Sequence, residues 1–258
     1  MVDGQKRPVG PADPGCFSPG RANRRAVSDT GLSTGCDALD DLLGGGLERG
    51  TVTQFYGAPG SGKTNVALSA VTEAVAEGGT AVYVDTEGLS VDRFEQILSG
   101  RVEDVETASA RVIVQAAHDF DEQVEAVRDV EDFADQADIV VLDSATGFYR
   151  LRRTEDEESG DALREVANQA THLLSLARRN DLVVVMTNQV YSDPESDSDR
   201  VRPLGGHTLT HWTGTVVRLE RFRGGKRRAT LEKHRSRPEG EYAQFEITGT
   251  GIESVTGR

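Results

Sequence analysis

The chain has 258 residues, enough for one α/β domain of ordinary size and too few for a second large domain. Its two cysteines exclude a disulfide framework, and the absence of a transmembrane run or signal-peptide core predicts a reduced, cytoplasmic setting. The formal net charge of −14 comes from 43 acidic and 29 basic residues, which excludes a uniformly basic surface for nucleic acid.

The basic residues are unusual in kind, because only four of them are lysines and the rest are arginines. An acidic surface nearly free of lysine indicates adaptation to molar intracellular salt. At that ionic strength the Debye length is about 3 Å, so self-repulsion is screened and local basic clusters can still bind a polyanion. A mildly acidic mesophilic enzyme is the alternative.

Residues 1–30 contain four prolines and almost no periodic apolar pattern, which predicts a disordered extension ahead of one domain over residues 31–258. Residues 32–47 predict a short capped helix that ends in glycines. A β-rich run at 51–56 then predicts the first core strand, and apolar residues at helical spacing predict a helix over 66–75.

Between that strand and that helix lies the pattern G-x-x-x-x-G-K-[ST], which predicts a phosphate-binding loop. Its glycines let backbone N–H groups turn toward one anion, and the helix N-terminus adds its positive end. Lys63 supplies a charge beside the β- and γ-phosphates, and Thr64 offers a hydroxyl to Mg²⁺. We therefore expect ATP and Mg²⁺ to be held by Gly57, Ala58, Pro59, Gly60, Ser61, Gly62, Lys63 and Thr64.

Further strands are predicted at 80–84, 112–115, 139–142 and 182–186, separated by helical patterns such as 120–133 and 163–177. Alternating β and α units predict a mostly parallel central sheet with helices on both faces. After residue 213 the β-rich segments 216–222, 229–233 and 244–247 predict a C-terminal antiparallel extension.

Three polar residues follow predicted strands at the edge where the phosphate loop lies. Asp143 is the candidate carboxylate for Mg²⁺, although a strand-end Asp also caps turns in many α/β proteins. Glu87 is the candidate that polarises an attacking water, with a solvated loop carboxylate as the alternative. Gln189 can donate a hydrogen bond to the γ-phosphate, although an amide after a strand is weak evidence alone.

These motifs occur in the order seen in the RecA superfamily, and within it the chain most resembles the RadB family, archaeal paralogues of the RadA recombinase. The resemblance covers roughly residues 32–255 and implies a RecA-like ATPase core. It rests on Thr34-Gly35 with residues 40–46, the phosphate loop, Asp85-Thr86-Glu87-Gly88, Leu142-Asp143-Ser144, Thr187-Asn188-Gln189-Val190 and Pro203-Leu204-Gly205-Gly206-His207.

The resemblance also implies individual roles. Glu87 takes the catalytic glutamate position, Gln189 the γ-phosphate sensor, and Arg93 the arginine that lies against adenine. The first DNA loop of recombinases falls where this chain has candidate DNA contacts at Tyr149, Arg150, Arg152 and Arg153. A salt-bridged surface cluster is the alternative there, because Glu155 to Glu158 follows at once.

The second DNA loop, residues 191–206, departs from the recombinase pattern because it is short and acidic. Only Arg200 and Arg202 are available to meet phosphate there, which argues against strand exchange. Lys233 and Arg235 resemble the fingers that KaiC- and DnaB-type relatives insert into a neighbour's ATP site. The alternatives for Lys233 and Arg235 are a contact with DNA and a solvated strand whose basic residues form salt bridges.

The RadB resemblance implies an archaeal accessory protein of DNA repair and homologous recombination, and the acidic, lysine-poor composition indicates a halophilic source. Such a protein binds ATP, Mg²⁺, single-stranded or branched DNA and the RadA recombinase, with weak or no hydrolysis and no strand exchange of its own. A KaiC-type signalling ATPase or autokinase is the alternative, disfavoured because Glu87 lacks an adjacent second glutamate. A replicative-helicase-like motor is disfavoured by the short second loop.

Overall fold

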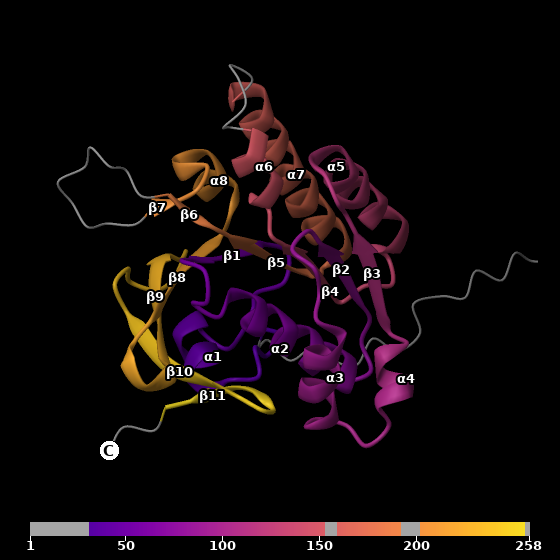
Figure 1. Ribbon diagram of the computed structural model, residues 1–258, viewed down its shortest axis with the longest axis vertical. Coiled ribbons are helices and arrows are strands. Elements are labelled where there is room, and N and C mark those ends of the chain that lie inside the picture. Colours follow the sequence, from indigo (N-terminus) through magenta and orange to yellow (C-terminus); the bar gives the residue numbers. More distant parts are fainter. Residues whose placement is uncertain (1–30, 153–158, 192–201, 256–258) are drawn as a thin grey trace, which may run out of the picture.

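A nine-stranded sheet forms the centre of the computed structural model (Figure 1). The structure describes residues 31–152, 159–191 and 202–255, so the predicted N-terminal extension lies outside the described residues. In sheet order the strands are β11 (Gly251–Ser254), β10 (Tyr242–Thr248), β9 (Lys226–Lys233), β8 (Thr215–Arg221), β1 (Val52–Gly57), β5 (Val183–Asn188), β4 (Ile139–Asp143), β2 (Ala81–Asp85) and β3 (Val112–Ala116).

The sheet has a parallel part and an antiparallel part. β3, β2, β4, β5, β1 and β8 pair in parallel, whereas β8, β9, β10 and β11 pair as antiparallel neighbours. β4 and β5 lie in the middle of the parallel part and are buried on both faces, which explains their nearly continuous runs of valine and other apolar residues. The prediction of a mostly parallel sheet with a C-terminal antiparallel extension is confirmed. A separate two-stranded ribbon joins β6 (Val190–Tyr191) to β7 (Arg202–Pro203).

Helices cover both faces of the sheet (Figure 1). One face carries α1 (Asp37–Leu43), α2 (Lys63–Ala76), α3 (Val91–Ser99) and α4 (Val105–Ser109). The other carries α5 (Phe120–Asp129), η1 (Val130–Phe133), α6 (Gly147–Arg152), α7 (Ser159–Asn180) and α8 (Gly206–Trp212). A short turn, η2 (Arg223–Gly225), joins β8 to β9. No helix in the described ranges is long and apolar enough to cross a membrane.

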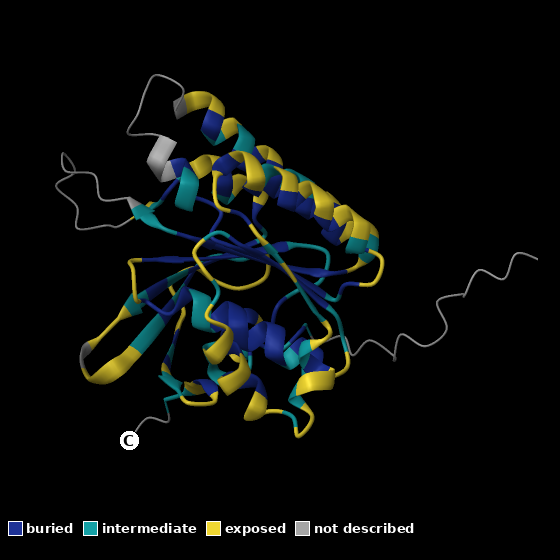
Figure 2. Cartoon of the chain, turned by 45° about the vertical axis from the view of Figure 1, so that its right-hand side comes forward, coloured by how far each residue is buried: buried dark blue, intermediate teal, exposed yellow. Residues whose placement is uncertain are grey.

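Two hydrophobic cores form, one on each face, because alternate strand residues point in opposite directions. Val141 and Val185 belong to the core under α2, whereas Val140 and Val184 belong to the core under α5 and α7. Figure 2 shows that α2 is buried over most of its length, whereas α7 exposes one side to solvent. The sequence patterns did not predict α3 or α4, two short helices between β2 and β3.

The segment before the phosphate loop is held by one carboxylate on α1. Asp40 accepts hydrogen bonds from the hydroxyl of Ser33 (2.6 Å), the hydroxyl of Thr34 (2.6 Å) and the backbone N–H of Thr34 (2.8 Å). Thr34 is fully buried. Because a buried hydroxyl without a partner is costly, Asp40 is the residue that lets this polar turn pack against the core.

Replacing Asp40 with alanine is expected to lower the free energy of unfolding by about 2 kcal/mol, because the hydroxyl and the backbone N–H of Thr34 lose their shortest hydrogen bonds and only a longer contact of the hydroxyl with the carbonyl oxygen of Cys36 remains. The matched control is Asp41→Ala, which removes the exposed carboxylate beside it on α1. Urea unfolding in molar KCl measures both changes. Equal stabilities for the two variants would contradict this role of Asp40.

Candidate nucleotide-binding site

The phosphate loop joins the end of β1 to the start of α2, as the sequence predicts. Gly60 and Gly62 have φ angles of 74° and 106°, in the left-handed region that favours glycine. A Cβ atom on Gly57 would lie 2.3 Å from the carbonyl oxygen of Leu219, so no larger residue fits there without a backbone shift. The loop can therefore turn its N–H groups toward an anion at the N-terminus of α2.

Lys63 is folded back onto its own loop. Its Nζ donates hydrogen bonds to the carbonyl oxygens of Gly57 (2.9 Å) and Ala58 (3.3 Å), and the residue is buried. Burial lowers the pKa of Lys63, and the carboxylates of Glu87 and Asp143 oppose that shift. The ammonium group thus lies among the groups that would surround a phosphate and a metal ion.

Asp143 ends β4 inside the protein, with only 2% of its surface exposed. Its carboxylate accepts hydrogen bonds from the hydroxyl of Tyr83 (2.7 Å) and from the hydroxyl of Thr187. Burial raises the pKa of Asp143, whereas hydrogen bonds from Thr187, Tyr83 and Thr64 lower it. The hydroxyl of Thr64 and the carboxylate of Asp143 are therefore together, and both are oxygen ligands of the kind Mg²⁺ prefers.

Glu87 and Gln189 meet although they are far apart in sequence. Oε1 of Glu87 accepts hydrogen bonds from Nε2 of Gln189 (2.8 Å) and from the hydroxyl of Ser144 (2.8 Å). Both side chains line the cavity that contains the phosphate loop. The structure thus brings together the predicted water-activating residue and the predicted phosphate sensor.

The cavity has a volume of about 340 Å³ and includes two arginines that the sequence analysis missed. They are Arg221, at the end of β8, and Arg227, near the start of β9. Alternation along the strand predicted at 216–222 could have placed Arg221 on a defined face, but its partner on β9 depends on a register that only the structure gives. The lining residues are Pro59, Gly60, Gly62, Lys63, Thr64, Asn65, Glu87, Gln189, Arg221, Arg227 and Ile247.

Arg93 lies on α3 beside this cavity rather than in its lining. Its Nε donates to the side-chain oxygen of Asn65 (3.0 Å), and its Nη2 donates to the carbonyl oxygen of Thr248 (2.8 Å). Burial lowers the pKa of the guanidinium. The side chain thus joins the start of α2 to the turn between β10 and β11, and its predicted contact with adenine stays a prediction.

The candidate DNA contacts have mixed positions. Tyr149 is 5% exposed and packs in the core under α7, so its ring is not available to stack on a base in this conformation. Arg150 and Arg152 lie on α6, whereas Arg153 and Arg200 lie outside the described residues. Arg202 is exposed on β7.

Lys233 and Arg235 make contacts within the chain. Nζ of Lys233 donates to the carbonyl oxygens of Thr210 (2.7 Å) and Thr213 (2.6 Å), at the C-terminal end of α8. Arg235 forms an ion pair with Glu48. Two of the three N–H donors of Lys233 are therefore used within the chain. A structural role at the end of α8 is thus an alternative to the prediction of a finger or a DNA contact.

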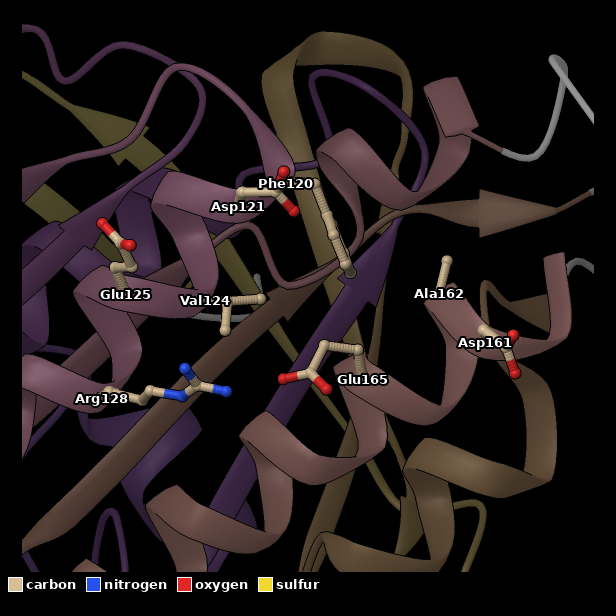
Figure 3. A pocket seen from close by; sticks show the side chains of 8 residues that line it. All are labelled: Phe120, Asp121, Val124, Glu125, Arg128, Asp161, Ala162 and Glu165. Carbon is tan, nitrogen blue, oxygen red and sulfur yellow. The ribbon is translucent and has the colours of Figure 1, made fainter. Parts of the chain in front are cut away.

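A second cavity, of about 370 Å³, lies between α5 and α7 (Figure 3). The side chains of Arg128 and Glu165 point toward one another across it. Asp121, Glu125 and Asp161 also line this cavity. Four carboxylates against one arginine disfavour a phosphate-bearing ligand in this cavity.

The chain was compared with known families, sequences and structures. The family model described as Rad51 matches residues 24–255. A protein of Halobacterium salinarum, named DNA repair and recombination protein RadB, is 68% identical over 88% of this chain and 97% of its own length. The chain belongs to the RadB family of DNA repair and recombination proteins.

Other RadB proteins support this placement. The one from Methanococcoides burtonii is 45% identical over 86% of this chain and 96% of its own length. A crystal structure titled as the RadB recombinase superposes with a TM-score of 0.74 at 36% identity, covering 87% of this chain and all of the other. Rad51- and RecA-family ATPases use a nucleotide and Mg²⁺, and the residues around Lys63 and Asp143 fit both.

Replacing Lys233 with methionine is expected to lower the free energy of unfolding by about 1–2 kcal/mol, because α8 loses the cation at its C-terminal carbonyls. The matched control is Lys226→Met, which removes an exposed lysine from the same strand. Thermal unfolding in molar KCl measures the loss. Unchanged stability together with lost DNA binding or ATP turnover would instead favour the finger or DNA-contact interpretation.

Proposed function

We propose that this RadB-family chain is an ATP-binding accessory protein of homologous recombination that binds DNA and modulates the RadA recombinase. ATP and Mg²⁺ occupy the cavity at the phosphate loop, and the bound nucleotide controls which partners are held. Hydrolysis is weak or absent, and the chain performs no strand exchange of its own. Single-stranded or branched DNA is the nucleic-acid partner.

The observation that carries this proposal is the convergence of three groups on one cavity. The phosphate loop provides Lys63 and Thr64, and the buried Asp143 behind Thr64 offers a second oxygen ligand for Mg²⁺. Glu87 and Gln189 line the same cavity, where they could reach a γ-phosphate. A magnesium ion held by Thr64 and Asp143 would supply positive charge to the phosphates and would favour the ionised form of Asp143. The chain's own residues position the phosphates and the attacking water.

The contacts of Glu87 support weak turnover. A general base must accept a proton from water, and Oε1 of Glu87 already accepts two hydrogen bonds, from Ser144 and Gln189. A water that donates its proton to this oxygen must therefore displace one of the two donors. Gln189 must break its hydrogen bond to Glu87 in order to donate to a γ-phosphate. Such an exchange of partners is what a γ-phosphate sensor requires.

The absence of strand exchange is supported by the two segments that resemble recombinase DNA loops. Tyr149 is buried, so the first segment lacks an available aromatic ring at that position. In the sequence of the second segment, Asp193, Glu195, Asp197 and Asp199 precede Arg200. Repulsion between these carboxylates and DNA phosphates opposes the close contact that strand exchange needs.

The decisive experiment measures ATP turnover with and without single-stranded DNA, together with strand exchange and phosphate transfer onto the protein, in molar KCl. We expect slow turnover, no strand exchange and no labelled protein when γ-labelled ATP is used. Robust strand exchange would contradict the accessory role. Stable labelling of the protein would favour the KaiC-type autokinase instead.

Replacing Lys63 with alanine is expected to abolish ATP binding, because the charge beside the phosphates is lost. Two hydrogen bonds within the loop are also removed, which lowers stability by only about 1–2 kcal/mol and leaves unfolding cooperative. Calorimetry measures binding and circular dichroism measures unfolding. The control is Arg111→Ala, an exposed basic residue beside β3, which should bind ATP normally.

A further inference from the structure

Two arginines face each other across the hairpin that borders the phosphate loop. Arg221 of β8 and Arg227 of β9 are register partners, and both line the cavity with Lys63 and Thr64. A Cβ atom placed on Gly60 would lie 3.8 Å from Nη1 of Arg221, and one placed on Gly62 would lie 3.6 Å from Nε of Arg227. The arginines therefore lie alongside the glycines of the loop.

The alternation of side chains explains this position. Val217 and Leu219 belong to the core under α2, and Arg221 is the next residue of β8 on that face. Ala229 and Leu231 of β9 belong to the same core, and Arg227 lies on their face. The two arginines thus extend the α2 side of the hairpin to the point where α2 begins.

The Arg221–Arg227 pair is the one like-charged pair among the six register pairs of β8 and β9. The preceding pair joins Glu220 to Arg228, and Arg218 forms ion pairs with Glu220 and Glu232. Like charges directly opposite each other destabilise a ladder. Charged residues of β8 and β9 are therefore paired with opposite charges away from the phosphate loop, and two like charges lie opposite each other only beside it.

Neither arginine has a carboxylate partner within the described ranges of the chain, although acidic residues outnumber basic ones. Nη1 of Arg227 donates to the carbonyl oxygen of Gly225, and its buried Nε has no hydrogen-bond partner among the described residues. Burial and the charge of Arg221 both lower the pKa of Arg227. An anion between the two guanidinium groups would reduce the repulsion between them and give Nε of Arg227 a hydrogen-bond acceptor.

The arginines and the acidic residues lie on opposite flanks of the loop. In the sheet order, β8 and β9 lie on one side of β1, whereas β4 and β2, which lead to Asp143 and Glu87, lie on the other. We propose that Arg221 and Arg227 form a clamp on the phosphate chain of a nucleoside triphosphate bound in the same protomer. This inference rests on the proposed function, because it assigns residues to the same ATP site.

The clamp makes affinity depend on the number of phosphates. Guanidinium groups form strong, charge-assisted hydrogen bonds with phosphate oxygens, so ATP gains more from the clamp than AMP does. The contact is independent of the base, so other nucleoside triphosphates gain as ATP does. It also differs from a finger supplied in trans, since both arginines belong to the chain that holds the phosphate loop.

The test compares Arg221→Gln and Arg227→Gln by calorimetric titration with ATP, ADP and AMP in molar KCl and Mg²⁺. We expect each variant to bind ATP about tenfold more weakly and AMP within about twofold of the unsubstituted protein. The matched control is Arg228→Gln. Arg228 is the next residue of β9, it points to the other face, and it stacks on Phe222 and Tyr242 at 4.7 and 4.6 Å.

A second readout separates binding from folding. Without nucleotide, Arg227→Gln should unfold at the same or a higher temperature, because repulsion from Arg221 is removed. The rise in unfolding temperature on adding ATP should be smaller than in the unsubstituted protein. Unchanged ATP affinity in both variants, or equal losses for ATP and AMP, would overturn the clamp alone. Failure of the unsubstituted protein to bind ATP would overturn the proposed function and the clamp with it.

Discussion

The parallel register of four neighbouring strands is the constraint on which the site depends. Asp85 of β2 pairs with Asp143 of β4, Leu142 of β4 pairs with Met186 of β5, and Asn188 of β5 pairs with Tyr56 of β1. Parallel strands end at one edge, so residues that follow different strands arrive together. A shift of one residue in β4 would turn Asp143 to the opposite face and away from the loop.

The antiparallel extension completes the site from the other side of β1. The hydroxyl of Tyr56, the residue before the loop, donates a 2.5 Å hydrogen bond to Glu232 of β9, and Glu232 also pairs with Arg218 of β8. These contacts lie on the face opposite Arg221 and Arg227. They hold the hairpin against β1, so the arginines need little reordering when a phosphate chain binds.

The sequence was sufficient for features that depend on local pattern and insufficient for those that depend on pairing between distant segments. Asp143, Glu87 and Gln189 could be placed at one edge because each follows a recognisable strand. The Arg221–Arg227 pair could not be placed in this way, because residues 226–228 are three consecutive basic residues in the sequence. Only the β8–β9 register shows which of their side chains faces the phosphate loop. The contacts of Lys233 could not be predicted from the sequence for a related reason. Its acceptors, the carbonyl oxygens of Thr210 and Thr213 at the end of α8, lie 23 and 20 residues away along the chain.

Arg93 has a consequence for motion. The turn between β10 and β11 lies at the outer edge of the sheet, where hairpins usually open first. Here the guanidinium of Arg93 donates to the carbonyl oxygens of Thr248, Gly249 and Gly251, and its Nε holds Asn65 near the start of α2. Opening of this turn therefore breaks contacts to the helix that follows the phosphate loop, so fraying of the sheet edge and loosening of the nucleotide site become one event.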